Sequence, residues 1–284
     1  MAKAPEGVDR DELTVVARKV LLDGLEALKE HLSALTIVGA QAVHLRTPDA
    51  VMSTAPYTTD GDLSIDPLLL GEHPHLDAAL RAAGFQLINK SQPGLWQRPE
   101  ALGDRTIPVE LDLLVPRQLS PKNGSRSAKV PPHGVMSARW IEGLETAAVD
   151  RSPLTVGSLD PRDGRSITVN VAGPAALLVA KAFKISERVE QAATRPDRLV
   201  IKDAGDVLRI MMATPVRQVA AAFVGLRADP RVGDVTSQGL EKLHALFGGA
   251  ATRGVEMAVG ALAGDISEAR VRALAPAFMR RLPR

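Results

Sequence analysis

The residue pattern changes character near residue 172, and this change constrains the fold more than any other feature of the chain. Before it, short apolar stretches bounded by turn residues predict strands at 35–38, 60–65, 85–89, 95–98, 106–115, 154–158 and 166–171. Before residue 172, helical periodicity also occurs at 9–30, with Asp9 as a cap, and at 75–83. After residue 172 the pattern predicts only helices, at 175–189, 203–212, 216–226, 237–247, 255–262 and 267–282. We therefore predict an α/β (α+β) chain with a mixed-sheet lobe, residues 1–172, followed by an all-helical lobe, residues 173–284.

Composition excludes several classes of protein. The chain has no cysteine, which excludes disulfides, thiolate metal sites and a cysteine nucleophile. Aromatic residues make up 3% of the sequence, too few for the stacking platforms that bind single-stranded nucleic acid. No apolar run approaches the roughly 18 residues of a membrane span, and no secretion signal precedes residue 13, so we expect a cytoplasmic protein with no membrane partner.

Acidic residues recur at alternate positions on two predicted strands. Asp60 and Asp62 are two residues apart, so their side chains lie on one face of the strand and can share a divalent ion. Glu110 and Asp112 alternate with Leu111 and Leu113 in the same way, which offers the pair a third carboxylate. Upstream, a strand that breaks at Gly39 into a helix-like segment, 41–46, would let the backbone approach a phosphate.

Basic residues gather in two segments. Between 117 and 139 the chain contains Arg117, Lys122, Arg126, Lys129, Arg139 and His133 and no acid. The closing stretch, 269–284, holds five arginines and no acid, although the whole chain has a net charge of only +2. These segments are either solvated surface or contacts for a polyanion such as RNA.

A strand, a glycine turn, an Asp-x-Asp strand and a later strand acid together resemble the catalytic core of the nucleotidyltransferase superfamily. Two further segments, Leu178 to Arg188 (LVAKAFKISER) and Lys202 to Leu208 (KDAGDVL), are similar to the signature of AbiEii/MenT-type nucleotidyltransferase toxins. The resemblance covers roughly residues 37–210. Ala40 departs from the pattern, because the family has a second Gly or Ser there.

The resemblance implies a role for each matching residue. Asp60, Asp62 and Asp112 would be catalytic ligands of Mg²⁺, with two ions expected and Mn²⁺ as a substitute, and Glu110 is the alternative third ligand. Lys181 would contact the triphosphate in a cleft between the lobes, with Asp203 as the acid required beside it. The remaining nucleotide-binding positions would be Gly39, Ala40, Thr59, Lys184 and Arg188.

Structural alternatives exist for the same residues. The Asp60 and Asp62 pair is also compatible with a surface turn, and Lys181 and Arg188 with an ordinary solvated helix face. Asp203 and Asp206 could be helix N-terminal acids favoured by the helix dipole.

The expected activity is metal-dependent transfer of a nucleoside monophosphate from an NTP to the 3′ end of tRNA, with release of pyrophosphate. The resemblance further implies the toxin of a toxin–antitoxin pair, with a cognate antitoxin as partner, which blocks aminoacylation and growth. Two alternatives stay open at this point: transfer to a small molecule, as in antibiotic-modifying enzymes, and a non-catalytic module that binds a nucleotide or a partner.

Overall fold

The computed structural model describes residues 10–48, 50, 58–119 and 127–284, which fall into two compact units. The first contains the described residues of 10–45, 58–141 and 151–172, and the second contains 46–48, 50, 142–150 and 173–284. The α/β class and the order of a sheet followed by helices are confirmed. Asp9, the predicted cap, lies outside the described residues.

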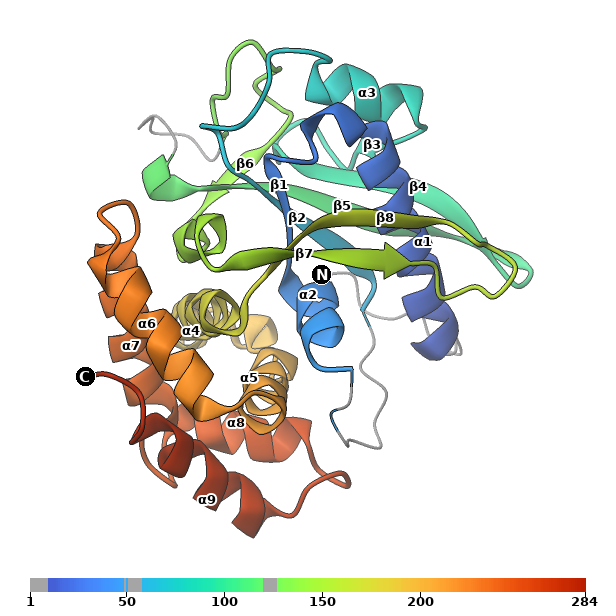
Figure 1. Ribbon diagram of the computed structural model, residues 1–284. Coiled ribbons are helices and arrows are strands. Elements are labelled where there is room, and N and C mark those ends of the chain that lie inside the picture. The colour runs from blue at the N-terminus through green and yellow to red at the C-terminus, as the bar shows by residue number, and fades with distance from the viewer. Residues whose placement is uncertain (1–9, 49, 51–57, 120–126) are drawn as a thin grey trace. The chain divides into compact units, whose positions relative to one another are not determined.

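In the described part of the first unit, eight strands form one mixed sheet in the order β3-β4-β5-β2-β1-β8-β7, with β6 beside β5 (Figure 1). Pairing is parallel for β2 with β5, β1 with β8 and β5 with β6, and antiparallel elsewhere. The strands are β1 (Leu35–Val38), β2 (Asp60–Ile65), β3 (Gln86–Leu87), β4 (Leu95–Leu102), β5 (Arg105–Pro116), β6 (Arg139–Ile141), β7 (Arg151–Gly157) and β8 (Ser166–Ala172). The predicted bounds of β1 and β2 are confirmed to the residue.

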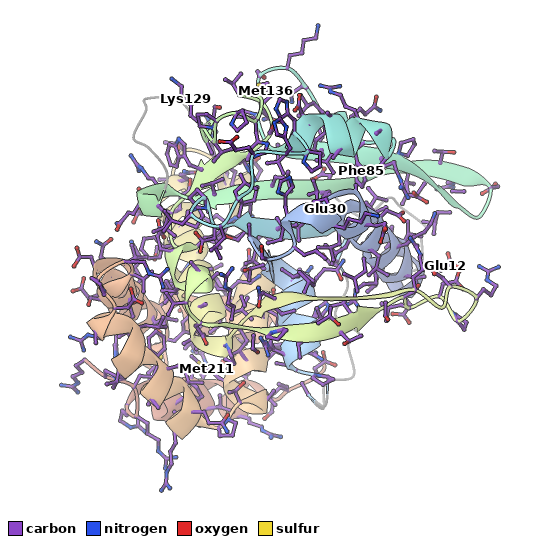
Figure 2. The ribbon with its side chains drawn as sticks, turned by 45° about the horizontal axis from the view of Figure 1, so that its top comes forward. Glu12, Glu30, Phe85, Lys129, Met136 and Met211 are labelled. Atoms are coloured by element: carbon purple, nitrogen blue, oxygen red, sulfur yellow. The ribbon has the colours of Figure 1, made fainter. Side chains whose placement is uncertain are left out.

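Helix α1 (Arg10–Ala27) covers one face of this sheet. Figure 2 labels Glu12 near its start and Glu30 just beyond its end, so its course can be followed. A Cβ on Gly24 would lie 2.5 Å from the Leu111 side chain, and one on Gly61 would lie 3.2 Å from the Leu21 side chain. Since side chains alternate along a strand, Asp60, Asp62, Glu110 and Asp112 occupy the face opposite α1.

Short helices connect the strands of the first unit. Helix α2 (Gly39–Arg46) follows β1 directly, α3 (Leu76–Ala82) precedes β3, and the 3₁₀ turns are η1 (Lys29–His31), η2 (Arg117–Leu119) and η3 (Glu145–Ala148). The predicted glycine end of α3 is confirmed, because Gly84 has a φ of 83°, a conformation that glycine adopts readily.

The second unit is helical, as predicted, and its helices run from yellow to red in Figure 1. They are α4 (Pro174–Gln191), α5 (Lys202–Ala213), α6 (Val216–Ala228), α7 (Gly233–Phe247), α8 (Arg253–Ala261) and α9 (Glu268–Met279), with the turn η4 (Pro196–Arg198). Among the described residues no single helix is long and apolar enough to cross a membrane. Pro196–Ala213 and Val216–Ala228 meet the requirements of length and composition only as a pair, and they are bent by 109° with respect to each other.

The division between the two units falls at residue 172 for most of the chain, but two segments before it, 46–50 (described at 46–48 and 50) and 142–150, lie in the second unit. Residues 142–150 belong to the second unit because Asp150 binds the start of α4: its backbone O accepts from Gly173 N at 2.7 Å, and its carboxylate accepts from Ala176 N at 2.8 Å. Thr47 belongs there because Arg209 of α5 donates to its hydroxyl at 2.8 Å.

Gly239 marks the closest approach of α7 to α4. A Cβ at this position would lie 2.8 and 2.9 Å from the two methyl carbons of Val179, a fully buried side chain. A β-branched residue is stiff at χ1 and cannot rotate away. We expect Gly239→Ala to lower the free energy of unfolding by about 1–3 kcal/mol, although alanine is the better helix former.

Gly225 of α6 is the matched control, because a Cβ there meets nothing within 4 Å. Gly225→Ala is expected to raise the free energy of unfolding by up to about 1 kcal/mol. Urea denaturation of both variants measures the contrast. Equal stabilisation by the two substitutions would contradict the close packing of α7 on Val179.

Candidate metal-binding carboxylate site

The register of two parallel strands brings four carboxylates together. Asp60 of β2 pairs opposite Glu110 of β5, and Asp62 opposite Asp112. Partners in a parallel pair point to the same face of the sheet, so the acids form a compact two-by-two group. The sequence placed each pair on one face of its own strand, and the strand pairing places both pairs on the same face.

Gly39 lies directly against this group. It has a φ of 66°, and a Cβ on it would lie 1.9 Å from Oδ2 of Asp62. Both the backbone conformation and the lack of a side chain are therefore needed here. The predicted glycine turn is confirmed, with α2 starting at Gly39 rather than at residue 41, and the neighbouring Ala40 is buried.

Asp60 is held by a residue that the sequence prediction missed. The hydroxyl of Thr58, which is fully buried, donates to Oδ1 of Asp60 at 2.7 Å, whereas the predicted Thr59 is half-buried. The side-chain amide of Gln41 donates to the main-chain oxygen of Asp60 at 3.4 Å and accepts from the buried Arg18 at 2.7 Å. A hydroxyl two residues before an acid is a common local hydrogen-bond donor, so Thr58 could have been found from sequence.

Asp112 has one basic contact, from a residue predicted to lie in a surface loop. Arg139 of β6 donates to Oδ2 of Asp112 at 2.7 Å. Oδ1 of Asp112 is buried and has no hydrogen-bond partner among the described residues, and the residue as a whole is 7% exposed. An unsatisfied buried carboxylate oxygen is costly, so the residue is held ready for another ligand.

Burial and the neighbouring acids raise the pKa values of Asp112 and Glu110. Burial and then the charge of Asp62 raise the pKa of Asp112 to about 8; Arg139 opposes this shift, and Asp60 and Glu110 add to it. Burial also raises the pKa of Glu110, and Asp60 contributes to that shift. Like charges that shift each other in this way are typical of functional carboxylate groups.

The donor set suits a hard divalent cation. All available ligands are carboxylate oxygens, which Mg²⁺ and Mn²⁺ prefer, and Oδ1 of Asp112 lacks a partner in the described structure. Within the described ranges, no three His, Asp or Glu side chains are already arranged to hold a metal ion. The residues fit such an ion by chemistry, and Asp60, Asp62 and Asp112 are the candidates to hold it.

The predicted basic and acidic residues of the second unit form a buried cluster on α4 and α5. Nζ of Lys181 donates to Oδ1 of Asp203 and to Oδ2 of Asp206, both at 2.6 Å, and Lys181 is 4% exposed. Arg188 also donates to Asp203, and Lys184 lies 3.4 Å from it. The prediction that Asp203 lies beside Lys181 is confirmed. Asp206, which the sequence suggested only as an acid near a helix N-terminus, also binds Lys181.

Charge pairing dominates the electrostatics of this cluster. Burial alone would raise the pKa of Asp203, but the charges of Lys181, Lys184 and Arg188 lower it well below its ordinary value. Burial likewise opposes the charge on Lys181, but Asp203 and Asp206 raise its pKa above the ordinary value. Lys181 thus binds two carboxylates here, whereas Lys184, with 40% of its side chain exposed, and Arg188, with 17%, are more open to a phosphate.

The basic segment 117–139 is only partly an open basic surface. Arg139 binds Asp112, His133 is buried, and Arg117 lies over the ring of Trp140 with 4.4 Å between the guanidinium carbon and the centroid. Lys129 is exposed (Figure 2). Lys122 and Arg126 lie outside the described residues. In the closing stretch, four of the five arginines are exposed: Arg270, Arg280, Arg281 and Arg284.

A cavity of about 910 Å³ in the first unit contains none of the predicted site residues. Its walls come from α1, the β4–β5 turn and residues 159–165. Several of its charged side chains form ion pairs with one another: Lys19 with Glu100, Arg165 with Asp163 and Arg162 with Asp160.

No protein-family model, curated protein or solved structure matches the chain. The resemblance to AbiEii/MenT-type toxins therefore depends on the motif residues themselves, and the roles that it implies stay predictions. The structure adds the placement of those residues: the acids of the first unit share one face of β2 and β5, and those of the second share one lysine.

The raised pKa of Asp112 predicts a pH dependence of stability. The folded chain keeps this proton up to about pH 8, whereas the unfolded chain loses it near pH 4, so the free energy of unfolding falls as pH rises between these values. Asp112→Asn cannot ionise and should remove that loss, at most about 1.4 kcal/mol per pH unit.

Urea unfolding at pH 5, 6.5 and 8 in the presence of EDTA measures this effect. The variant should be more stable than the wild-type protein at pH 8, and the difference in the free energy of unfolding should be smaller at pH 5. A gap that is constant with pH would show that Asp112 is ionised throughout.

Lys181 is expected to stabilise the second unit strongly. Lys181→Met leaves two buried carboxylates without their shared cation and should lower the free energy of unfolding by about 3–5 kcal/mol at pH 7. Protonation of these carboxylates relieves the defect, so the difference from wild type should narrow towards pH 4.

Lys184→Met, on the same helix but partly exposed, is the control and should cost less than about 1 kcal/mol. Thermal unfolding of both variants at pH 7 and pH 4 provides the test. A small, pH-independent cost for Lys181→Met would contradict the buried pairing.

Proposed function

We propose that the protein is a metal-dependent nucleotidyltransferase that moves a nucleoside monophosphate from an NTP to a hydroxyl acceptor. The observation that carries this proposal is the group Asp60, Asp62 and Asp112 on one sheet face, with an unsatisfied buried oxygen on Asp112 and Gly39 against Asp62. A fold that keeps like charges together at a cost in stability is expected to use them for a cation.

In the proposed reaction the acceptor hydroxyl loses its proton to solvent and its oxygen forms a bond to the α-phosphorus. The bond between the α-phosphorus and the α,β-bridging oxygen breaks, and pyrophosphate leaves. Bound Mg²⁺ would neutralise the phosphate charge and lower the pKa of the attacking hydroxyl. Within the chain, Thr58 would hold the rotamer of Asp60, and Arg139 would hold that of Asp112. Gly39 keeps the space beside Asp62 free of a side chain.

In the second unit, Lys184 and Arg188 are the cations best able to meet a phosphate, because Lys181 is committed to Asp203 and Asp206. Lys181 would then act by keeping α4 and α5 in place. The expected triphosphate contact would therefore come from Lys184 and Arg188 rather than from Lys181, but from the same helix, α4.

The acceptor and the biological role follow from the resemblance. We propose the 3′ end of tRNA as acceptor, in the cytoplasm, and a toxin that a cognate antitoxin restrains. The exposed arginines of the closing stretch and Lys129 are basic residues able to bind an RNA backbone, which is recognised largely through phosphate contacts.

Label transfer tests this proposal. Purified protein is incubated with total tRNA, Mg²⁺ and each α-labelled NTP in turn, and the RNA is resolved on a denaturing gel. We expect label on tRNA with one or two NTPs, and a loss of about 100-fold or more in Asp60→Asn and Asp62→Asn, because a bound metal supplies several kcal/mol of transition-state stabilisation.

Asp104→Asn is the control, since Asp104 is an exposed acid in the turn between β4 and β5 of the same sheet. It should transfer label at the wild-type rate. If pyrophosphate is released but tRNA is not labelled, the acceptor is a small molecule rather than tRNA. If no NTP gives either pyrophosphate or labelled tRNA, the transferase proposal is refuted.

A further inference from the structure

Arg139 reaches the carboxylate site from a strand that is fixed by tertiary packing. Strand β6 lies parallel to β5, with Arg139 opposite Leu114. Gly94 holds this arrangement: a Cβ there would lie 2.6 Å from the backbone N of Arg139, and the Gly94 oxygen accepts from Leu113 N at 2.8 Å. The guanidinium is thus delivered to Asp112 by backbone contacts rather than by a flexible loop.

The hydrogen bond from Arg139 makes the two carboxylate oxygens of Asp112 different from each other. Oδ2 accepts from Arg139 at 2.7 Å, while Oδ1 is buried with no hydrogen-bond partner in the described part of the chain. A planar guanidinium holds a carboxylate oxygen with a defined direction, which an ammonium does not. Oδ1 of Asp112 therefore lacks a partner, and Oδ2 is oriented and partly neutralised by Arg139, which makes it the weaker ligand for a cation.

We propose that Arg139 is a positioning residue that makes Asp112 a one-oxygen ligand, and that this makes the carboxylate site select Mg²⁺ or Mn²⁺ over Ca²⁺. The inference rests on the metal ligands of the proposed function and adds the origin of their selectivity.

Coordination chemistry explains why one oxygen matters. Ca²⁺ takes six to eight oxygens at about 2.3–2.6 Å and often binds both oxygens of a carboxylate, whereas Mg²⁺ requires six ligands at about 2.0–2.1 Å. A carboxylate limited to one oxygen lowers the ligand count available to Ca²⁺ and leaves that for Mg²⁺ intact. Mn²⁺ takes the same oxygen ligands and is visible by electron paramagnetic resonance, so it serves as the probe.

The experiment measures dissociation constants for Mn²⁺ directly, from the spectrum of the free ion, and for Ca²⁺ by competition, on full-length protein without nucleotide. The quantity compared is the ratio of the Ca²⁺ constant to the Mn²⁺ constant. Removing the positive charge of Arg139 should strengthen the binding of both ions, but they carry the same charge, so this general effect largely cancels in the ratio.

We expect Arg139→Met to lower the ratio about tenfold or more, because Ca²⁺ gains the freed oxygen and Mn²⁺ does not. Arg139→Gln keeps an uncharged donor, should lower the ratio by less, and replaces the methionine variant if that one does not fold, as checked by thermal unfolding. Arg105→Met, an exposed arginine at the start of β5, should leave the ratio unchanged.

Each outcome separates this inference from the proposed function. An unchanged ratio in the folded Arg139 variants would overturn the positioning role and leave the transferase proposal standing. Failure of the wild-type protein to bind either ion would overturn both. Selective binding that depends on Arg139, with no label transfer, would support the inference and refute only the transfer reaction.

Discussion

The pairing of β2 with β5 is the constraint on which the candidate site depends. These strands are far apart in sequence, yet their register sets Asp60 beside Glu110 and Asp62 beside Asp112. A slip of one residue would turn one acid pair towards α1 and expose the leucines that pack there. On the opposite face, Gly24 and Gly61 leave room for the Leu111 side chain, since a Cβ on either glycine would lie within 3.1 Å of it. The apolar packing of α1 on one face of the sheet thus stabilises a strand register that keeps the four acids together on the other face.

The two units treat buried charge in opposite ways. On α4 and α5, Asp203 and Asp206 share Lys181, and Arg188 and Lys184 add to the positive charge, so burial is offset by ion pairs. On the sheet, Asp112 has one guanidinium contact and three acidic neighbours among the described residues, and its pKa is raised to about 8. A stably paired cluster is typical of a structural role, whereas an unsatisfied one is typical of a binding site. For this reason the proposed chemistry is assigned to the acids of the first unit, and Lys181 is interpreted as support for the helices.

The proposed activity and the proposed selectivity depend on the same few supporting residues. Thr58 and Arg139 each bind one oxygen of a candidate ligand, and Gly39 keeps the adjacent space open. Supporting contacts of this kind orient metal ligands and tune the ion that they accept. The site therefore includes supporting residues as well as acids. Two of them, Thr58 and Arg139, lie outside the motifs on which the resemblance is based.

The sequence by itself determined the α/β class, most of the element types and the bounds of β1 and β2. Local periodicity and Gly or Pro signals are encoded within a few residues, which is why β1 and β2 were predicted to the residue. It also determined that each acid pair shares a face, since the alternation of side chains is a property of a single strand. Only the tertiary structure decided that the two acid pairs lie on the same face of the sheet and that Arg139, predicted to lie in a surface loop, binds Asp112. The burial of Lys181 and the place of residues 142–150 in the helical unit were also decided by tertiary contacts. Each of these depends on contacts between residues far apart in the chain, and no local pattern carries that information.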